Sequence, residues 1–156
     1  MISIDVGNGL LALIDDEDLA RVERFTWRIR EDCYVQRTWI EDGKTCHELL
    51  HRFVMNADEN ELVDHENGDR WDCQKHNLRV ATFSQNAANR PTTAQDRAWK
   101  GIYRHSNRWK ARIKLEGQNV YLGSFQTAQE AAYAYDVAAK RLFGEFAHLN
   151  FPPAGT

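Results

Sequence analysis

Residues 62–69 read LVDHENGD, and this stretch decides the fold that we expect for the first half of the chain. Two apolar residues lead into Asp64-His65. The Asn67-Gly68 pair that follows favours a tight turn between two strands. We therefore expect Asp64 and His65 at the end of a strand that enters a hairpin.

Two asparagines follow this pair farther along the chain. Asn77 comes before an apolar stretch, and Asn86 lies in a stretch that favours a helix. Thr82 and Ser84 are both residues of a type that caps a helix N-terminus. We expect the helix to begin at one of them and to carry Asn86.

The spacing of these residues resembles a known family of nucleases. Residues 63–69, then HNLRVAT at 76–82 and SQN at 84–86, are similar to the HNH family of phage and intron homing endonucleases. Residues 50–55 match the family as well, and residues 15–27 match it more loosely. The resemblance covers about residues 1–90 and implies a ββα-metal core, also called the His-Me finger, in which a short hairpin and a helix hold one metal ion.

The resemblance assigns a role to four side chains. His65 is the general base, Asp64 and Asn86 ligate one divalent metal ion, and Asn77 orients His65. General chemistry supports these roles, because histidine titrates near neutral pH and can take a proton from water. Carboxylate and carboxamide oxygens are hard ligands suited to Mg²⁺ or Mn²⁺. The alternative for Asn77 is a loop asparagine that satisfies backbone groups.

Four positions in or near this motif also bear on the site. His51 and Arg52 are candidates for contacts with phosphate, although structural roles are open for both. Glu66 stands where an apolar residue is common in the family, and Asn86 stands in place of the final histidine.

The charge of the chain is divided unevenly. The net charge of −3 separates into −7 over residues 1–90 and +4 over residues 91–156. Such asymmetry indicates two modules with different tasks. Residues 91–98 begin with proline and are polar, so we expect a linker there between a domain of residues 1–90 and one of residues 99–152.

The basic module has the pattern of three strands followed by a helix. We expect strands at residues 100–104, 108–115 and 119–125, with turns between them. Thr127 and Glu130 form a capping-box pattern at the start of a helix, and Gly144 is suited to end it. The helix face expected in the core consists of Ala128, Ala131, Ala132, Tyr135, Ala139 and Leu142. The expected fold class is thus α+β, a nuclease core plus a three-stranded antiparallel sheet packed on one helix.

This module resembles the APETALA-type, or ethylene-response-factor, DNA-binding domain over residues 99–152. The matching stretches include KGIYR at 100–104, WKARI at 109–113 and YLGSF at 121–125. The resemblance implies a sheet that reads DNA in the major groove. The exposed side chains expected to contact DNA are Lys100, Tyr103, Arg104, Arg108, Trp109, Arg112, Lys114 and Tyr121.

Alternation along the middle strand divides its residues between two faces. It places Trp109, Ala111 and Ile113 on the buried face and Lys110, Arg112 and Lys114 on the exposed face. Since the resemblance also implies that Trp109 touches DNA, we expect a twist or a bulge near it.

The expected function is metal-dependent cleavage of double-stranded DNA, with the second module supplying affinity. The alternatives are a catalytically inactive DNA-binding regulator and a nuclease that degrades DNA without specificity. A single site per chain favours action as a monomer. Cys33, Cys46 and Cys73 are an odd number at wide spacings, as expected of reduced cysteines. Without a membrane span or a signal peptide in the pattern, we expect a cytoplasmic protein of phage or bacterial origin.

Overall fold

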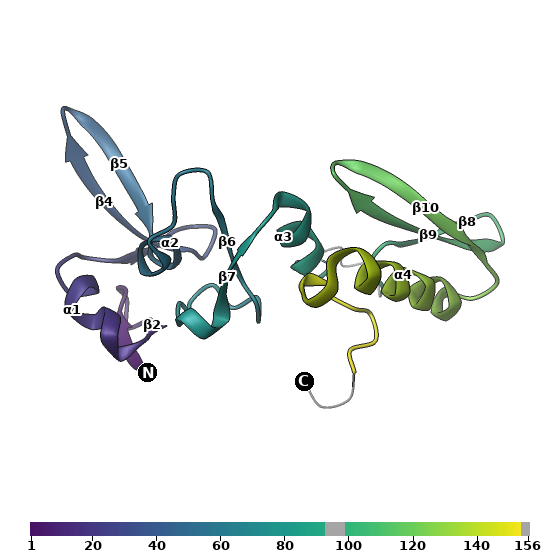
Figure 1. Cartoon of the computed structure of the whole chain (residues 1–156), viewed down its shortest axis with the longest axis horizontal. Coiled ribbons are helices and arrows are strands. Elements are labelled where there is room, and N and C mark those ends of the chain that lie inside the picture. The colour runs from purple at the N-terminus through teal and green to yellow at the C-terminus, as the bar shows by residue number, and fades with distance from the viewer. Residues whose placement is uncertain (93–98, 154–156) are drawn as a thin grey trace. The chain divides into compact units, whose positions relative to one another are not determined.

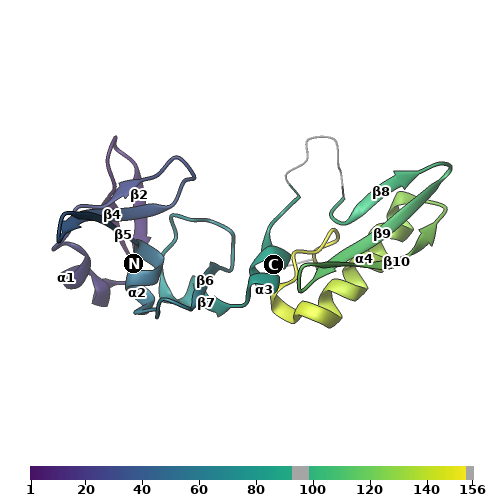
Figure 2. The same cartoon turned by 90° about the horizontal axis from the view of Figure 1, so that it is seen from above.

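The computed structural model describes residues 1–92 and 99–153 and divides the chain into two compact units, Met1–Ala81 and Thr82–Thr156. Both units combine small antiparallel sheets with few helices, which confirms a mixed fold of helices and strands (Figures 1 and 2). Most of the expected linker, residues 93–98, lies outside the described residues, and the expected domain boundaries stay a prediction. None of the described helices is long and apolar enough to span a membrane.

The first unit contains three small antiparallel sheets, two short α-helices and two 3-10 helices at Asp16–Asp18 and Lys75–Asn77. One sheet pairs β1 (Ile2–Asp5) with β2 (Leu11–Ile14). In the second, β4 (Val35–Glu41) lies between β3 (Arg28–Ile29) and β5 (Lys44–Leu49). The third pairs β6 (Leu62–His65) with β7 (Leu78–Ala81). The α-helices are α1 (Leu19–Val22) and α2 (Leu50–Met55). Their buried apolar side chains form one core, which includes Val6, Ile14, Val22, Val35, Leu50 and Val54.

The connection between β6 and β7 differs from the tight hairpin that the sequence indicates. The turn at Asn67-Gly68 is present, with Gly68 at φ 76° and its N–H donating to the carbonyl of His65. The strands nevertheless pair only from Leu78 onward, so residues 66–77 form a long connection. Backbone hydrogen bonds attach this connection to Leu13 of β2. Such a long-range contact leaves no trace in a local turn pattern, and this explains the difference.

The second unit begins with α3 (Phe83–Asn89) and continues with a three-stranded sheet and a long helix. The strands β8 (Ile102–His105), β9 (Arg108–Leu115) and β10 (Gln118–Phe125) lie in the order β10-β9-β8, and α4 (Ala128–Phe143) follows. This confirms the expected three strands and one helix of the basic module. Figure 1 shows α4 running along the sheet.

Sequence-encoded caps fix both helices of the second unit. Thr82 caps α3 with Gln85 in a capping box, and Thr127 caps α4 in the same way with Glu130. Gly144 ends α4 at φ 56°. These caps confirm the expected start of both helices and the expected end of α4.

The buried face of α4 matches the expectation in the middle of the helix, whereas Ala128 at its start is half-buried and its end differs. Ala131, Ala132, Tyr135 and Ala139 are buried, whereas Leu142 is 41% exposed and Phe143 is buried in its place. The buried side chains at this end are Tyr135, Ala139 and Phe143, which are four residues apart and lie on one face of the helix. Leu142 is three residues after Ala139 and lies beside this face.

Candidate active site and nucleic-acid interface

Asp64 and His65 are the last two residues of β6, and both are buried. Because successive side chains of a strand point to opposite faces, the two side chains have different surroundings. Asp64 lies opposite Arg79 of β7 in the antiparallel pairing. The Arg79 Nε lies 3.3 Å from the Asp64 Oδ2, so the guanidinium orients this carboxylate. The same guanidinium lies 3.6 Å from the carboxylate of Glu66.

The His65 ring lies among aromatic and sulfur-bearing side chains. Its centroid is 4.7 Å from that of His51 and 6.1 Å from that of Tyr34. Its Nε2 lies 3.9 Å from the Cys73 Sγ. Burial lowers the pKa of His65 to about 4, although Asp69 and Asp72 act to raise it. The imidazole is therefore neutral at pH 7 and able to accept a proton.

Asn77 is buried inside the connection that follows Asp64-His65. Its Oδ1 accepts a hydrogen bond from the backbone N–H of Asn67, and its Nδ2 donates to the carbonyl of Asp72. Its own carbonyl accepts from the N–H of Glu66, the residue after His65. Asn77 thus ties together the connection that follows His65, and its role in catalysis stays a prediction.

His51 and Arg52 lie on α2, and each makes contacts within the first unit. The His51 ring is 4% exposed and packs against Tyr34 and His65. The Arg52 guanidinium donates to the backbone carbonyls of Asp58 and Glu61. Both side chains are therefore engaged within the first unit, and phosphate contacts by them stay a prediction.

Asn86 lies half-buried on α3, which belongs to the second unit, whereas Asp64, His65 and Asn77 lie together in the first. Over the described ranges 1–92 and 99–153, no three or more His, Cys, Asp or Glu side chains are grouped so that they could hold a metal ion. The expected ligands are only two side chains, the carboxylate of Asp64 and the carboxamide of Asn86. Both offer oxygens of the kind that Mg²⁺ and Mn²⁺ prefer, so the donor chemistry fits a divalent ion.

The sheet of the second unit presents a basic face with aromatic side chains. Alternation along β9 is confirmed from Ala111 to Lys114, because Ala111 and Ile113 are buried while Arg112 and Lys114 are exposed. It is not seen at Trp109 and Lys110, which are both half-buried. A register shift interrupts β10 between Tyr121 and Gly123, opposite Arg112 and Ala111. The pairing of Trp109 itself, with Arg104 and Phe125, is regular, so the irregularity expected near Trp109 lies instead in the neighbouring strand opposite Arg112 and Ala111.

Most of the expected DNA contacts are exposed. The exposed ones are Arg104, Arg108, Arg112, Lys114 and Tyr121. The Arg112 guanidinium lies over the Tyr103 ring, 5.0 Å from its centroid.

Three of the expected contacts are half-buried instead of exposed, and packing within the unit is the reason. Tyr103 lies beneath Arg112, and Trp109 packs against the hydrophobic core. The amino group of Lys100 donates to backbone carbonyls of α3 and its end. Their contact with DNA stays a prediction.

Residues 56–88 match the HNH endonuclease family model. The chain is also 28% identical to an uncharacterized HNH endonuclease of Acanthamoeba polyphaga mimivirus, over 92% of this chain and 76% of the viral protein. These matches confirm the resemblance of the first half to HNH endonucleases.

The second half is similar to plant transcription factors. The chain is 53% identical to dehydration-responsive element-binding protein 2A of Arabidopsis thaliana, over 29% of this chain and 14% of that protein. It is 34% identical to an ethylene-responsive transcription factor of the same plant, over 58% of this chain and 59% of that protein. The resemblance to ethylene-response factors is confirmed, and the chain spans only part of these plant relatives.

Sequence reasoning missed Arg79 and Cys73 as neighbours of the Asp64-His65 pair. Arg79 belongs to the Asn-Leu-Arg string that helped to identify the family, but no role was assigned to it. Pairing Leu62–His65 antiparallel with Leu78–Ala81 places Arg79 opposite Asp64. A register argument on the sequence would have found this residue, whereas the contact of Cys73 depends on the loop conformation.

The burial of His51 leads to a prediction for the pH dependence of stability. Burial, His65 and Arg52 together lower the pKa of His51 from 6.5 to about 3. The unfolded state therefore binds the proton more tightly, and stability is lost as the pH falls from about 6.5 towards 3. This histidine contributes a slope of up to about 1.4 kcal/mol per pH unit.

Denaturant unfolding between pH 7 and pH 4 tests this slope. His51→Gln should reduce the slope of the unfolding free energy against pH by the contribution of about one proton. His47→Gln, which changes an exposed histidine, serves as the control. An unchanged slope in His51→Gln would show that this histidine is not held neutral in the folded protein.

Proposed function

We propose that the chain is a metal-dependent DNA endonuclease of the homing type that acts as a monomer on double-stranded DNA. The observation that carries the proposal is the buried Asp64-His65 pair, which ends β6 inside the segment that matches the HNH endonuclease model. Arg79 orients the carboxylate of Asp64, and the next residue of the strand, His65, is neutral at pH 7. Together with the β6–β7 hairpin, α3 would complete a ββα-metal core.

His65 acts as the general base in this proposal. The Nε2 of its ring lies 3.9 Å from the Cys73 Sγ. Removal of a proton from water by this imidazole gives an oxygen that attacks phosphorus, while one ester P–O bond breaks and the leaving oxygen takes up a proton. Asn77 keeps the loop after His65 in place through Asn67 and Asp72.

Asp64 and Asn86 would hold one Mg²⁺ or Mn²⁺ ion. When bound, such an ion stabilises charge on the phosphate and on the leaving oxygen. Arg79 orients the Asp64 carboxylate from the opposite strand. Arg79 thus takes part in the site by positioning a ligand.

The second unit supplies affinity for DNA in this proposal. Its exposed arginines suit contacts with guanine edges, while lysine and aromatic side chains suit backbone and sugar. Tethering a nuclease to a binding unit raises the local concentration of the cutter at the bound DNA.

The test of this function is cleavage of supercoiled plasmid by the full chain with Mg²⁺ or Mn²⁺. We expect conversion to nicked or linear forms and no conversion when EDTA removes the metal. An intact plasmid with both metals, at protein concentrations that shift DNA in a gel, would contradict the proposal and favour a DNA-binding regulator.

The exposed position of Arg112 leads to a prediction for DNA binding. It is exposed on β9 over the Tyr103 ring, and a specific arginine–base contact contributes about 1–3 kcal/mol. Arg112→Ala should therefore weaken the affinity for a preferred sequence about tenfold or more in a gel-shift titration. Arg141→Ala, an exposed arginine on α4, is the matched control and should bind as the wild type does. Equal affinities for both variants would show that DNA does not contact this face.

A further inference from the structure

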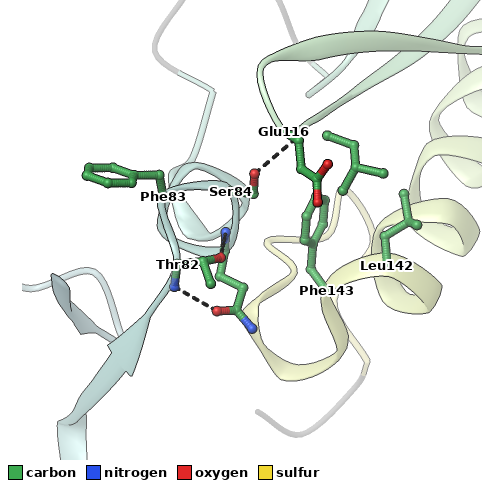
Figure 3. A pocket seen from close by; sticks show the side chains of 8 residues that line it. Thr82, Phe83, Ser84, Glu116, Leu142 and Phe143 are labelled. Carbon is green, nitrogen blue, oxygen red and sulfur yellow. Dashed lines mark hydrogen bonds between the residues drawn. The ribbon is translucent and has the colours of Figure 1, made fainter. Parts of the chain in front are cut away.

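Helix α3 carries Asn86 but is packed into the second unit. Ala88 of α3 lies in the same hydrophobic core as Ile113 of β9 and Phe143 of α4. The Ser84 Oγ accepts a hydrogen bond of 3.1 Å from the backbone N–H of Glu116 in the β9–β10 turn. Figure 3 shows Ser84 facing this turn, with Phe83 on the other side of the helix.

The C-terminal end of α3 has a further attachment. Arg90 is extended, and Pro91 has no N–H, so the helix does not continue beyond Asn89. The Lys100 amino group instead donates to the carbonyls of Ala87, Ala88 and Arg90. The backbone N–H of His148 also donates to the carbonyl of Ala88. A positive charge at this position interacts favourably with the helix dipole.

Lys100 is itself held in place by the rest of the second unit. Its N–H donates to the Oδ1 of Asn150, and its carbonyl accepts from the Nδ2 of Asn150. The N–H of Asn150 donates to the buried carboxylate of Asp136 on α4. A continuous chain of hydrogen bonds therefore runs from α4 through Lys100 to the end of α3.

The attachment uses one face of α3, and Asn86 lies on the other. Ser84 and Ala88 are four residues apart and share the face that contacts the second unit. Asn86 is two residues from each of them, which places it on the opposite side of a helix. The second unit can thus grip α3 without covering the side chain expected to bind metal.

We propose that the DNA-binding unit positions the metal ligand Asn86, and that Lys100 and Ser84 are positioning residues of the nuclease site. This inference rests on the proposed function, because it takes Asn86 to be a metal ligand. It gives Lys100 a role that does not involve contact with DNA. It also implies that in a fragment of residues 1–90 helix α3 would lack the contacts with residues 99–153 that hold it in place.

Hydrogen–deuterium exchange of the full chain tests whether the attachment exists. Amides of α3 should exchange faster in Ile113→Ala, which destabilises the second unit, and at the wild-type rate in Val54→Ala, which destabilises the first. Lys100→Met should speed exchange in α3, and Lys140→Met, an exposed lysine of α4, should not. If amides of α3 exchange faster in Val54→Ala and at the wild-type rate in Ile113→Ala, the attachment of α3 to the second unit is wrong.

Mn²⁺ binding without DNA tests the positioning role. Asn86→Ala should weaken Mn²⁺ binding, and Lys100→Met should weaken it about tenfold, as is typical of residues that position a metal ligand. The double variant should bind no more weakly than Asn86→Ala, and Lys100→Arg should restore most of the affinity. Wild-type affinity in Lys100→Met, together with faster exchange in α3, would overturn the positioning role.

A different result would identify failure of the proposed function. If Asp64→Ala weakens Mn²⁺ binding and Asn86→Ala does not, the assignment of Asn86 as a ligand is wrong, and the positioning role falls with it. If neither variant changes Mn²⁺ binding, the proposed metal site itself is wrong. Exchange in α3 still reports in both cases whether the second unit holds this helix.

Discussion

Replacing His65 by alanine should lower the rate of plasmid cleavage about a hundredfold to ten-thousandfold, the usual contribution of a general base. The reason is that His65 is a buried imidazole beside Asp64, neutral at pH 7, and able to accept the proton of the attacking water. The measurement is the initial rate of nicking of supercoiled plasmid in Mg²⁺. The gel-shift affinity for DNA should stay unchanged, because the proposed binding face lies in the other unit.

His47→Ala is the control for this variant. His47 is an exposed histidine of β5 in the same unit, and its ring contacts the Thr38 hydroxyl. It should cleave at the wild-type rate. If His65→Ala cleaves as fast as His47→Ala, the assignment of the general base is wrong.

Gly101→Ala should destabilise the second unit by about 3 kcal/mol or more, because it combines a clash in the core with backbone strain. Gly101 precedes β8 at φ 74°, a conformation that side chains rarely adopt. An added Cβ would lie 2.2 Å from the Tyr135 ring and 2.6 Å from the carbonyl oxygen of Arg112. Since Tyr135 is buried and the other contact is backbone, neither can move away easily.

Gly117→Ala separates the clash from the strain. Gly117 has φ 82°, but an added Cβ would meet nothing within 4 Å. This variant should cost about 1 kcal/mol from the backbone alone. Thermal unfolding of both variants measures the difference, and equal losses would show that the packing of Tyr135 against Gly101 is not as described.

The second unit was largely predictable from the sequence because its signals are local. Capping boxes at Thr82 and Thr127, alternation along β9 and Gly144 at the end of α4 each act within a few residues. The capping box at Thr127 and the end of α4 at Gly144 are confirmed, and Thr82 is the one of two expected caps that is observed. Alternation is confirmed from Ala111 to Lys114. Lys100 behaves differently, because its amino group binds carbonyls of a helix that precedes the expected linker.

The candidate site was predictable in its residues more than in its surroundings. The motif identified Asp64 and His65, and their place at the end of a strand was confirmed. The contacts of His65 with His51, Tyr34 and Cys73 bring together β6, α2 and two loops, so they depend on tertiary packing. The attachment of residues 66–77 to β2 is equally non-local. For these reasons the connection was expected to be shorter than it is.

The most direct test of the central claim, a metal-dependent nuclease site at Asp64-His65, is plasmid cleavage by Asp64→Asn across a range of Mg²⁺ concentrations. The substitution keeps the size of the side chain and removes the charge that would bind metal and that Arg79 contacts. We predict saturable, EDTA-sensitive cleavage by the wild type and a rate lower by about a hundredfold or more in the variant. Cleavage by Asp64→Asn at the wild-type rate, with the same dependence on Mg²⁺, would contradict the account.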